Sequence, residues 1–169
     1  MKKVAVYPGS FDPITLGHVD IIKRGINLFD KLIILVMINP KKQGLFNIFE
    51  RKVLIEKSLK EFNLLNCEVD VYQGLLLDYL RNNNLKYIIK GIRAISDFEY
   101  EFQQYIVNSG FDNEIETVFF MTNYAYMYLS SSLVKEIAYF KGDISKFVPT
   151  SIIEDINNKI NNLRELKLI

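Results

Sequence analysis

Short apolar runs alternate along this chain with longer stretches in which apolar residues recur every three or four positions. The short runs are rich in β-branched and aromatic residues, a pattern that predicts strands at 4–7, 32–38, 69–72, 87–89 and 117–120. The longer stretches have the spacing of amphipathic helices, which we expect at roughly 19–29, 48–62, 75–82, 97–109, 133–140 and 152–163. Strands and helices therefore alternate, and the chain ends in helices.

This alternation predicts an α/β fold: a single-domain, Rossmann-like, doubly wound parallel sheet of about five strands with a C-terminal helical extension. The run 32–38 is apolar throughout, as expected for a parallel strand that is covered on both faces. No linker-like composition or internal repeat interrupts the pattern, so we expect one domain over residues 1–169. Ligands of such folds bind beyond the carboxyl ends of the strands, so the site is expected in the loops after strands.

Composition narrows the range of partners. The 169 residues are 49% hydrophobic and 24% charged with a net charge of +1, and no basic block predicts binding to nucleic acid or to a membrane. A single cysteine, Cys67, excludes an internal disulfide, and one Cys with one His cannot make a usual zinc site, so no residue is assigned as a metal ligand. The longest apolar run is far shorter than a membrane span and no signal peptide is recognised, so we expect a cytoplasmic protein.

Residues 7–20, YPGSFDPITLGHVD, include the only histidine of the chain. Pro8 lacks a backbone N–H and cannot continue a central strand, so a turn is predicted here. Ser10 offers a hydroxyl to an anion, while Thr15 is a candidate N-cap for a helix whose first turn contains His18. The His18 ring can donate an N–H to a phosphate oxygen, and protonation would strengthen that bond. The residues alone leave open that His18 merely caps the helix or packs locally.

The run from Gly9 to His18 is not a Gly-rich phosphate loop, because neither G-x-G-x-x-G nor G-x-x-x-x-G-K-[ST] occurs in the chain. It resembles instead the G-[ST]-F-D-P-x-T-x-G-H signature of the bacterial phosphopantetheine adenylyltransferases. The H-x-G-H element of that nucleotidyltransferase superfamily appears here as residues 15–18, with Thr in the first position. Ser10 stands where the family usually has Thr, which keeps the hydroxyl. The resemblance implies ATP contacts from Ser10, Phe11 and His18.

Residues 90–101, KGIRAISDFEYE, resemble the R-G-[LI]-R-x-x-x-D-[FY]-E-x-E segment of the same family. Lys90 replaces the family's usual first arginine, so the charge toward the acceptor phosphate is kept but the bidentate fork is lost. Considered alone, the acidic residues could begin a solvated helix with Asp97 as N-cap, and this is the interpretation we prefer for Glu99. The resemblance implies that ATP is contacted by Gly91, Ile92, Arg93 and Glu101.

Residues 129–136, LSSSLVKE, resemble the family's I-S-S-S-x-[VIL]-[KR]-E element, a serine run that opens a helix. Hydroxyls and free N–H groups at a helix start bind phosphates, which agrees with the implied ATP contacts of Ser130, Ser131 and Ser132. Tyr126 stands where the family often has Trp and is assigned to adenine. The tyrosines at 124, 126 and 128 otherwise predict an extended segment with one aromatic face.

Two more positions are assigned to the acceptor by resemblance. Lys42 follows the second predicted strand at the family's spacing from His18, and it is expected to bind 4′-phosphopantetheine. Leu76 aligns with an apolar position that contacts this substrate, although the sequence alone does not distinguish it from a core leucine.

The implied reaction is attack by the phosphate of 4′-phosphopantetheine on the α-phosphorus of ATP, which gives dephospho-coenzyme A and pyrophosphate without a covalent intermediate. The nucleophile is already an anion, so no general base is needed, and catalysis comes from positioning and fixed charge. We expect His18 at the α-phosphate, Ser10 and Lys42 at the attacking phosphate, and Mg²⁺ held mainly by ATP and water. The resemblance also implies a homohexamer and feedback binding of coenzyme A.

Two other classes of function stay open at this stage. The Gly-His and serine motifs are shared with other nucleotidyltransferases, such as nicotinamide-mononucleotide adenylyltransferases and glycerol-phosphate cytidylyltransferases. Only acceptor residues such as Lys42 and Lys90 separate these from the preferred assignment. A nucleotide-binding regulator on the same fold would bind ATP without turnover, although the intact His18 argues against it.

Overall fold

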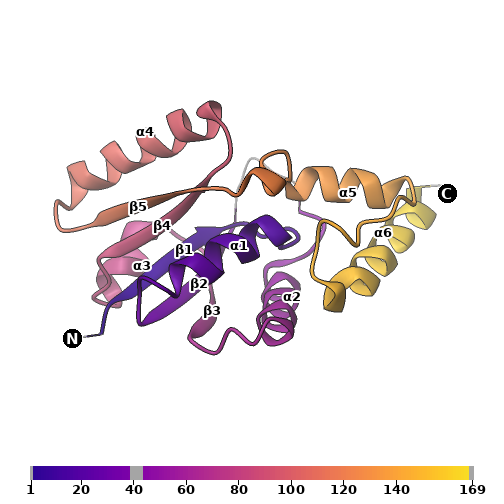
Figure 1. Cartoon of the computed structure of the whole chain (residues 1–169), viewed down its shortest axis with the longest axis horizontal. Coiled ribbons are helices and arrows are strands. Elements are labelled where there is room, and N and C mark those ends of the chain that lie inside the picture. The colour runs from indigo at the N-terminus through magenta and orange to yellow at the C-terminus, as the bar shows by residue number, and fades with distance from the viewer. Residues whose placement is uncertain (1, 39–43, 168–169) are drawn as a thin grey trace.

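The computed structural model describes residues 2–38 and 44–167, so Lys42 lies outside the described residues. The strands are β1 (Val4–Gly9), β2 (Lys31–Met37), β3 (Cys67–Tyr72), β4 (Tyr87–Ile92) and β5 (Glu116–Met121). The α-helices are α1 (Leu16–Gly25), α2 (Ile48–Glu61), α3 (Leu76–Asn82), α4 (Ile95–Phe111), α5 (Ser131–Tyr139) and α6 (Ile153–Lys167), and the short 3₁₀ helices are η1 (Tyr124–Tyr126) and η2 (Thr150–Ile152). Every predicted strand and helix is confirmed, with ends shifted by a few residues (Figure 1).

The strands form a parallel sheet in the order β3-β2-β1-β4-β5, which confirms the doubly wound α/β fold. The chain moves outward from β1 to β3 and then crosses back to β4 on the other side of β1. The order therefore reverses between β1 and β4, which is where ligands bind in this class of fold. Pairing of these two strands is limited to Ala5 with Tyr87 and Val6 with Ile88, so the strands are free to diverge toward their carboxyl ends.

The predicted turn at Pro8 is wrong, because Pro8 and Gly9 continue β1 in register with β2. The proline is tolerated because the β1–β4 ladder ends at Val6, so the missing N–H removes no ladder bond on that side. The chain reverses only at Phe11, whose φ of 46° is in the left-handed region. The first site loop therefore begins after Gly9, because β1 extends beyond the predicted strand 4–7.

Alternate residues of the strands face two separate cores. One core contains Ala5, Ile34 and Ile89 and is covered by α1, α2, α5 and α6. The other contains Val6 and Ile88 and is covered by α3, and Figure 1 shows α1 and α3 on opposite sides of the strands. Because both faces are covered, residues 32–36 of β2 are all buried, as the apolar run predicts.

Helix α4 packs less closely than the other long helices, since none of its described side chains is buried. It lies along the β5 edge of the sheet in Figure 1, where the ring of Phe98 meets that of Phe119 at a centroid distance of 5.9 Å. Large apolar side chains on this helix are left exposed, namely Ile95, Phe98, Phe102, Ile106, Val107 and Phe111. We refer to these as the exposed apolar residues of α4.

Candidate active site

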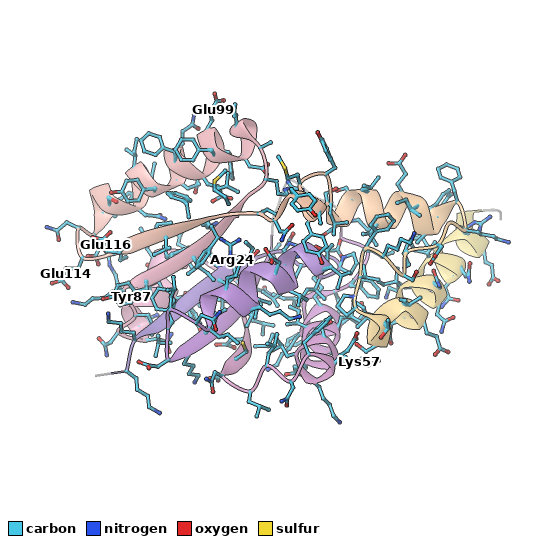
Figure 2. All side chains as sticks on the ribbon, viewed as in Figure 1. Arg24, Lys57, Tyr87, Glu99, Glu114 and Glu116 are labelled. Carbon is cyan, nitrogen blue, oxygen red and sulfur yellow. The ribbon has the colours of Figure 1, made fainter. Side chains whose placement is uncertain are left out.

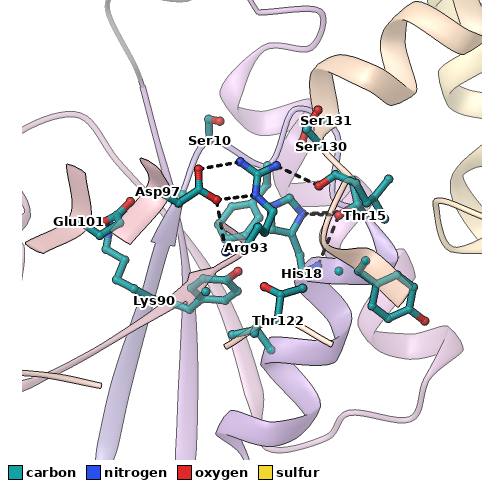
Figure 3. A pocket seen from close by; sticks show the side chains of 18 of the residues that line it. Ser10, Thr15, His18, Lys90, Arg93, Asp97, Glu101, Thr122, Ser130 and Ser131 are labelled. Carbon is teal, nitrogen blue, oxygen red and sulfur yellow. Dashed lines mark hydrogen bonds and ion pairs between the residues drawn. The ribbon is translucent and has the colours of Figure 1, made fainter. Parts of the chain in front are cut away.

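A pocket of about 350 Å³ opens at the carboxyl ends of β1 and β4 (Figure 3). Its walls come from β1 and the loop that follows, from the start of α1, from β4 and α4, and from the start of α5. Most of the residues assigned from the sequence line it, namely Ser10, Phe11, His18, Lys90, Gly91, Arg93, Glu101, Tyr126, Ser130, Ser131 and Ser132. The fold therefore brings three separate sequence motifs to one cavity.

His18 is held in one orientation by the helix that it helps to start. Thr15 is the N-cap of α1, as predicted, and His18 at the third helical position completes a reciprocal capping box. The backbone N–H of Thr15 donates to Nδ1 of His18 at 3.0 Å. A backbone N–H can only donate, so Nδ1 has no proton and the neutral ring keeps its proton on Nε2. Capping and ligand binding are thus compatible, because Nε2 is the nitrogen left for the pocket.

The environment of His18 keeps the ring neutral. Burial lowers its pKa from the ordinary 6.5 to about 4, and the positive charge of Arg93 acts in the same direction. The Phe11 ring supports it edge-on at a centroid distance of 5.1 Å. Of the two protonation states considered from the sequence, the structure favours the neutral ring, and the donor offered near pH 7 is its Nε2–H.

Arg93 is fixed in the pocket by two kinds of acceptor. Its Nε and Nη2 donate to the Asp97 carboxylate at 2.9 and 3.2 Å, and its Nη1 donates to the carbonyl oxygen of Leu129 at 2.9 Å. A guanidinium has five N–H groups, so two remain for a ligand. Asp97 is not the N-cap that the sequence suggests, because Ala94 occupies that position. Asp97 instead orients Arg93 from the first turn of α4, while Glu99 points away into solvent (Figure 2).

Lys90 and Glu101 form an ion pair inside the pocket. Nζ of Lys90 lies 2.9 Å from Oε2 of Glu101, and each side chain is 20% exposed. The contact does not have the geometry of a hydrogen bond. Oε2 of Glu101 is buried and has no hydrogen-bond partner in the part of the chain that the structure describes. Burial and the nearby Glu101 charge raise the pKa of Tyr7 above its usual range. The ion pair places one positive and one negative side chain inside the pocket.

The serine run begins α5, as predicted. Ser130 is the N-cap and accepts the N–H of Leu133 at 3.1 Å, while the hydroxyl of Ser131 donates to the carbonyl oxygen of Pro13 at 2.7 Å. The first N–H groups of a helix have no partner within it, so those of Ser131 and Ser132 are available to an anion. The Ser131 hydroxyl proton is already used, so the run offers its backbone donors and the hydroxyls of Ser130 and Ser132.

The extended segment predicted for the tyrosines before α5 is wrong. Residues 124–126 form η1, because Asn123 accepts the N–H of Ala125 at 3.0 Å and starts a tight turn. Tyr124 and Tyr128 are 84% and 91% exposed, whereas Tyr126 packs on the core and lines the pocket. Gly17 permits this approach, since a Cβ there would lie 3.3 Å from that of Tyr126.

Comparison with known proteins identifies the family. A family model described as cytidylyltransferase-like matches residues 6–137. A phosphopantetheine adenylyltransferase of Alkaliphilus metalliredigens is 54% identical over 157 residues, which cover 93% of this chain and 99% of the relative. One of Clostridium perfringens is 50% identical over 162 residues, which cover 96% and 98%. The chain belongs to the phosphopantetheine adenylyltransferase family.

The similarity to phosphopantetheine adenylyltransferases extends over nearly the whole chain. The resemblance of the three sequence motifs to this family is therefore confirmed. A solved structure from Vibrio parahaemolyticus, provisionally described as a nicotinate-nucleotide adenylyltransferase, matches with a TM-score of 0.70 and 16% identity. The match covers 92% of this chain and 99% of that one. At this level of identity the likeness concerns the fold alone.

Some residues that the sequence assigns to ATP or the acceptor do not line the pocket of this member of the phosphopantetheine adenylyltransferase family. Ile92 is 1% exposed and faces the core instead, and Leu76 at the start of α3 packs against the second core. Lys42 lies outside the described residues. The sequence patterns do not identify some other pocket residues, among them Tyr7, Ile21 and Thr122. Tyr7 has the alternating pattern of an ordinary strand residue in β1, and Thr122 lies directly after β5. Only the order of the strands in the sheet shows that both lie at the pocket.

Within residues 2–38 and 44–167, no group of three or more His, Cys, Asp or Glu side chains is placed to hold a metal ion. Among the helices that the structure describes, none is both long and apolar enough to cross a bilayer.

Proposed function

We propose that this protein transfers the adenylyl group of ATP to 4′-phosphopantetheine, forming dephospho-coenzyme A and pyrophosphate, and that residues 1–169 form the single domain that does so. The observation that carries the proposal is the neutral His18 ring, whose Nδ1 is used by Thr15 and whose Nε2–H is left for a pocket rich in anion donors. The names of the relatives support the choice of substrates.

The nucleotide side of the site comprises α4, α5 and the end of β4. The two free N–H groups of Arg93 and the free backbone donors of α5 bind the β- and γ-phosphates of ATP. Tyr126 lies beside Gly17 and packs on adenine, and Ser10, Phe11 and Gly91 approach the nucleotide from the β1 and β4 ends. Glu101 is the pocket carboxylate that accepts from a hydroxyl or amino group of ATP.

The acceptor side comprises Ser10, Lys42, Leu76 and Lys90. Lys90 exchanges its contact with Glu101 for the phosphate of 4′-phosphopantetheine, while Lys42 and the Ser10 hydroxyl hold the same phosphate in line with the α-phosphorus. Leu76 is proposed for the pantetheine arm from its family position alone. Because the attacking phosphate is already an anion, the site requires no general base, which agrees with a neutral His18.

The chemical step is a direct displacement. A phosphate oxygen of the acceptor forms a bond to the α-phosphorus, and the bond from that phosphorus to the pyrophosphate oxygen breaks. Nε2–H of His18 donates to a non-bridging oxygen of the α-phosphate, whose charge grows in the transition state. A fixed donor in a partly dry site needs no reorganisation at that moment, so His18 contributes mainly to kcat.

Magnesium is proposed to enter with ATP. The Asp97 and Glu101 carboxylates of the pocket are paired with Arg93 and Lys90, so the donor set suits an ion held by phosphate oxygens and water rather than by a protein cage. When bound, Mg²⁺ neutralises charge on the phosphates of ATP. Ser130 and the α5 donors then hold the same phosphates from the protein side.

We also propose that the protein is a cytoplasmic homohexamer that coenzyme A binds as a feedback ligand. The exposed apolar residues of α4 support assembly, because so many large apolar side chains exposed on one helix are unusual in a monomer and are typical of an interface. Coenzyme A shares the pantetheine arm of the acceptor, so the same pocket is its proposed site.

The proposal is tested by pyrophosphate release from purified protein with ATP and Mg²⁺. The acceptors are 4′-phosphopantetheine, nicotinamide mononucleotide and none, with CTP and glycerol 3-phosphate run alongside. Release only with 4′-phosphopantetheine is the expected result. Release only with another acceptor would keep the chemistry of His18 and refute the roles of Lys42 and Lys90, whereas ATP binding without any release would indicate a regulator.

A further inference from the structure

The carboxylate of Asp12 joins three segments that are far apart in the sequence. Its oxygens accept the backbone N–H groups of Leu45 and Phe46, each at 2.9 Å, and Nζ of Lys135 lies 2.9 Å from Oδ2. Asp12 is only 6% exposed, so these groups replace water around the charge. Burial opposes its ionisation, but the two N–H bonds and Lys135 outweigh this and hold its pKa below the usual range. The loop after β1, the segment before α2 and helix α5 therefore meet at one charged side chain.

Arg51 of α2 completes this cluster from the core side. Its Nε donates to the carbonyl oxygen of Phe46 at 2.7 Å, and its Nη1 donates to that of Ser10 at 3.2 Å. Its Nε also lies 3.5 Å from Oδ1 of Asp12, with both side chains nearly buried. Gly44 leaves room for the guanidinium, because a Cβ at that position would collide with it. Removing one charge from such a cluster leaves the others unbalanced in a poorly solvated place.

The cluster lies beside the catalytic pocket rather than in it. Asp12 and Lys135 line a small adjoining cavity that shares Ser10, Ser131 and Ser132 with the pocket that contains His18, and neither of the two lines that pocket itself. Asp12 follows Phe11, whose ring supports His18, and Lys135 lies one helical turn beyond the serine run. The ion pair therefore spans the His18 loop and the helix that supplies the phosphate donors.

We propose that Asp12 and Lys135 are a positioning pair, whose ion pair sets the place of the α5 donors relative to His18. The inference rests on the proposed adenylyl transfer and assigns to it two residues that touch neither substrate. The α5 donors face the β- and γ-phosphates, which gain charge as the bond to the α-phosphorus breaks. A shifted α5 therefore loses more interaction in the transition state than in the bound ground state, so kcat falls more than the KM for ATP rises.

The test compares Lys135→Met, which keeps an aliphatic stem without the charge, with Lys135→Arg, which keeps the charge. Pyrophosphate release at saturating substrates should show kcat lowered about 10- to 100-fold in Lys135→Met with less than about threefold change in the KM for ATP. Lys135→Arg should restore kcat to within about threefold of the wild type. The matched control is Lys57→Met, which removes the 2.8 Å ion pair with Asp155 on the surface of α2, away from the pocket (Figure 2). A Lys135→Met kcat equal to that of the control overturns the positioning pair.

Asp12→Asn completes a double-mutant cycle. If the two residues act as a unit, the Asp12→Asn/Lys135→Met variant has about the kcat of either single variant, whereas losses that multiply overturn the pair. Should Asp12→Asn not fold, the comparison at Lys135 decides alone. Hydrogen exchange at the Leu133 and Val134 amides gives a readout without turnover, and it should be faster in Lys135→Met than in the control. A wild type that releases no pyrophosphate refutes the proposed function, whereas an active wild type with an unaffected Lys135→Met refutes only the positioning pair.

Discussion

Nδ1 of His18 lies 3.0 Å from the backbone nitrogen of Thr15, and this contact decides which proton the ring offers to a ligand. Because Thr15 can only donate there, the neutral ring bears its proton on Nε2. The arrangement turns an ordinary helix cap into a fixed hydrogen-bond donor at the edge of the pocket. Burial and the nearby Arg93 charge lower the pKa of the ring, so this donor is a neutral imidazole near pH 7.

The titration of His18 follows from this environment. The chain has one histidine, so tag-free protein gives a single set of imidazole signals in long-range ¹H–¹⁵N NMR. We expect the Nε2–H tautomer and a pKa near the lowered value of about 4. The unfolded chain binds this proton at higher pH than the folded one, so its contribution to stability is lost as the pH falls from about 6.5 toward 4. A midpoint close to 6.5, or an Nδ1–H tautomer, would contradict the geometry.

Replacing Lys90 by arginine tests the acceptor site. Arginine can keep a contact with Glu101 along one edge and present a second edge to a phosphate. Calorimetry should show the Kd for 4′-phosphopantetheine lowered by about 3- to 10-fold in Lys90→Arg, with the KM for ATP unchanged. Lys86→Arg changes an exposed lysine just before the same strand and is the matched control. Equal affinities in wild type, Lys90→Arg and control would place Lys90 outside the acceptor site.

Asp97 is expected to support ATP binding through Arg93. Asp97→Asn removes the carboxylate that orients the guanidinium, so the KM for ATP should rise about 3- to 10-fold with a smaller change in kcat. Glu99→Gln alters the same helix at a residue that points into solvent, and it should leave both constants unchanged. If Asp97→Asn lowers the KM instead, the carboxylate competes with ATP for Arg93 rather than orienting it.

The exposed apolar residues of α4 make assembly testable. Val107→Glu places a charge on a side chain that is 51% exposed in the single chain, so the fold tolerates it but an apolar interface does not. Light scattering after size exclusion should show a lower mass for Val107→Glu than for the wild type. Leu65→Glu changes a residue that is 82% exposed after α2 and should keep the wild-type mass. A wild-type protein that is monomeric in solution would refute the proposed hexamer.

The periodicity of the sequence was sufficient for the architecture. Each predicted strand and helix is present, because the strands alternate with helices long enough to cover both faces of the sheet. The error at Pro8 arose because a proline is forbidden only where its N–H would pair, and the sequence does not show that the β1–β4 ladder ends at Val6. The error at Tyr126 arose because alternating tyrosines satisfy a strand period, while Asn123 imposes a local turn.

The site was only partly predictable. His18, Arg93 and the serine run could be identified because they stand in motifs whose residues and spacing resemble those of the phosphopantetheine adenylyltransferases. Tyr7 and Thr122 were missed because their place in the pocket depends on which strands are neighbours. The protonation state of His18 was also out of reach of the sequence, since it depends on burial and on the distance to Arg93.

The most direct test of the account is the single-turnover rate of dephospho-coenzyme A formation by wild type and by His18→Ala, with ATP and 4′-phosphopantetheine both saturating. We predict a rate about 10²- to 10³-fold lower in the variant, with the Kd for ATP within about threefold of the wild type, because the Nε2–H bond strengthens mainly in the transition state. A variant that forms the product at nearly the wild-type rate would contradict the assignment of His18 as the transition-state donor.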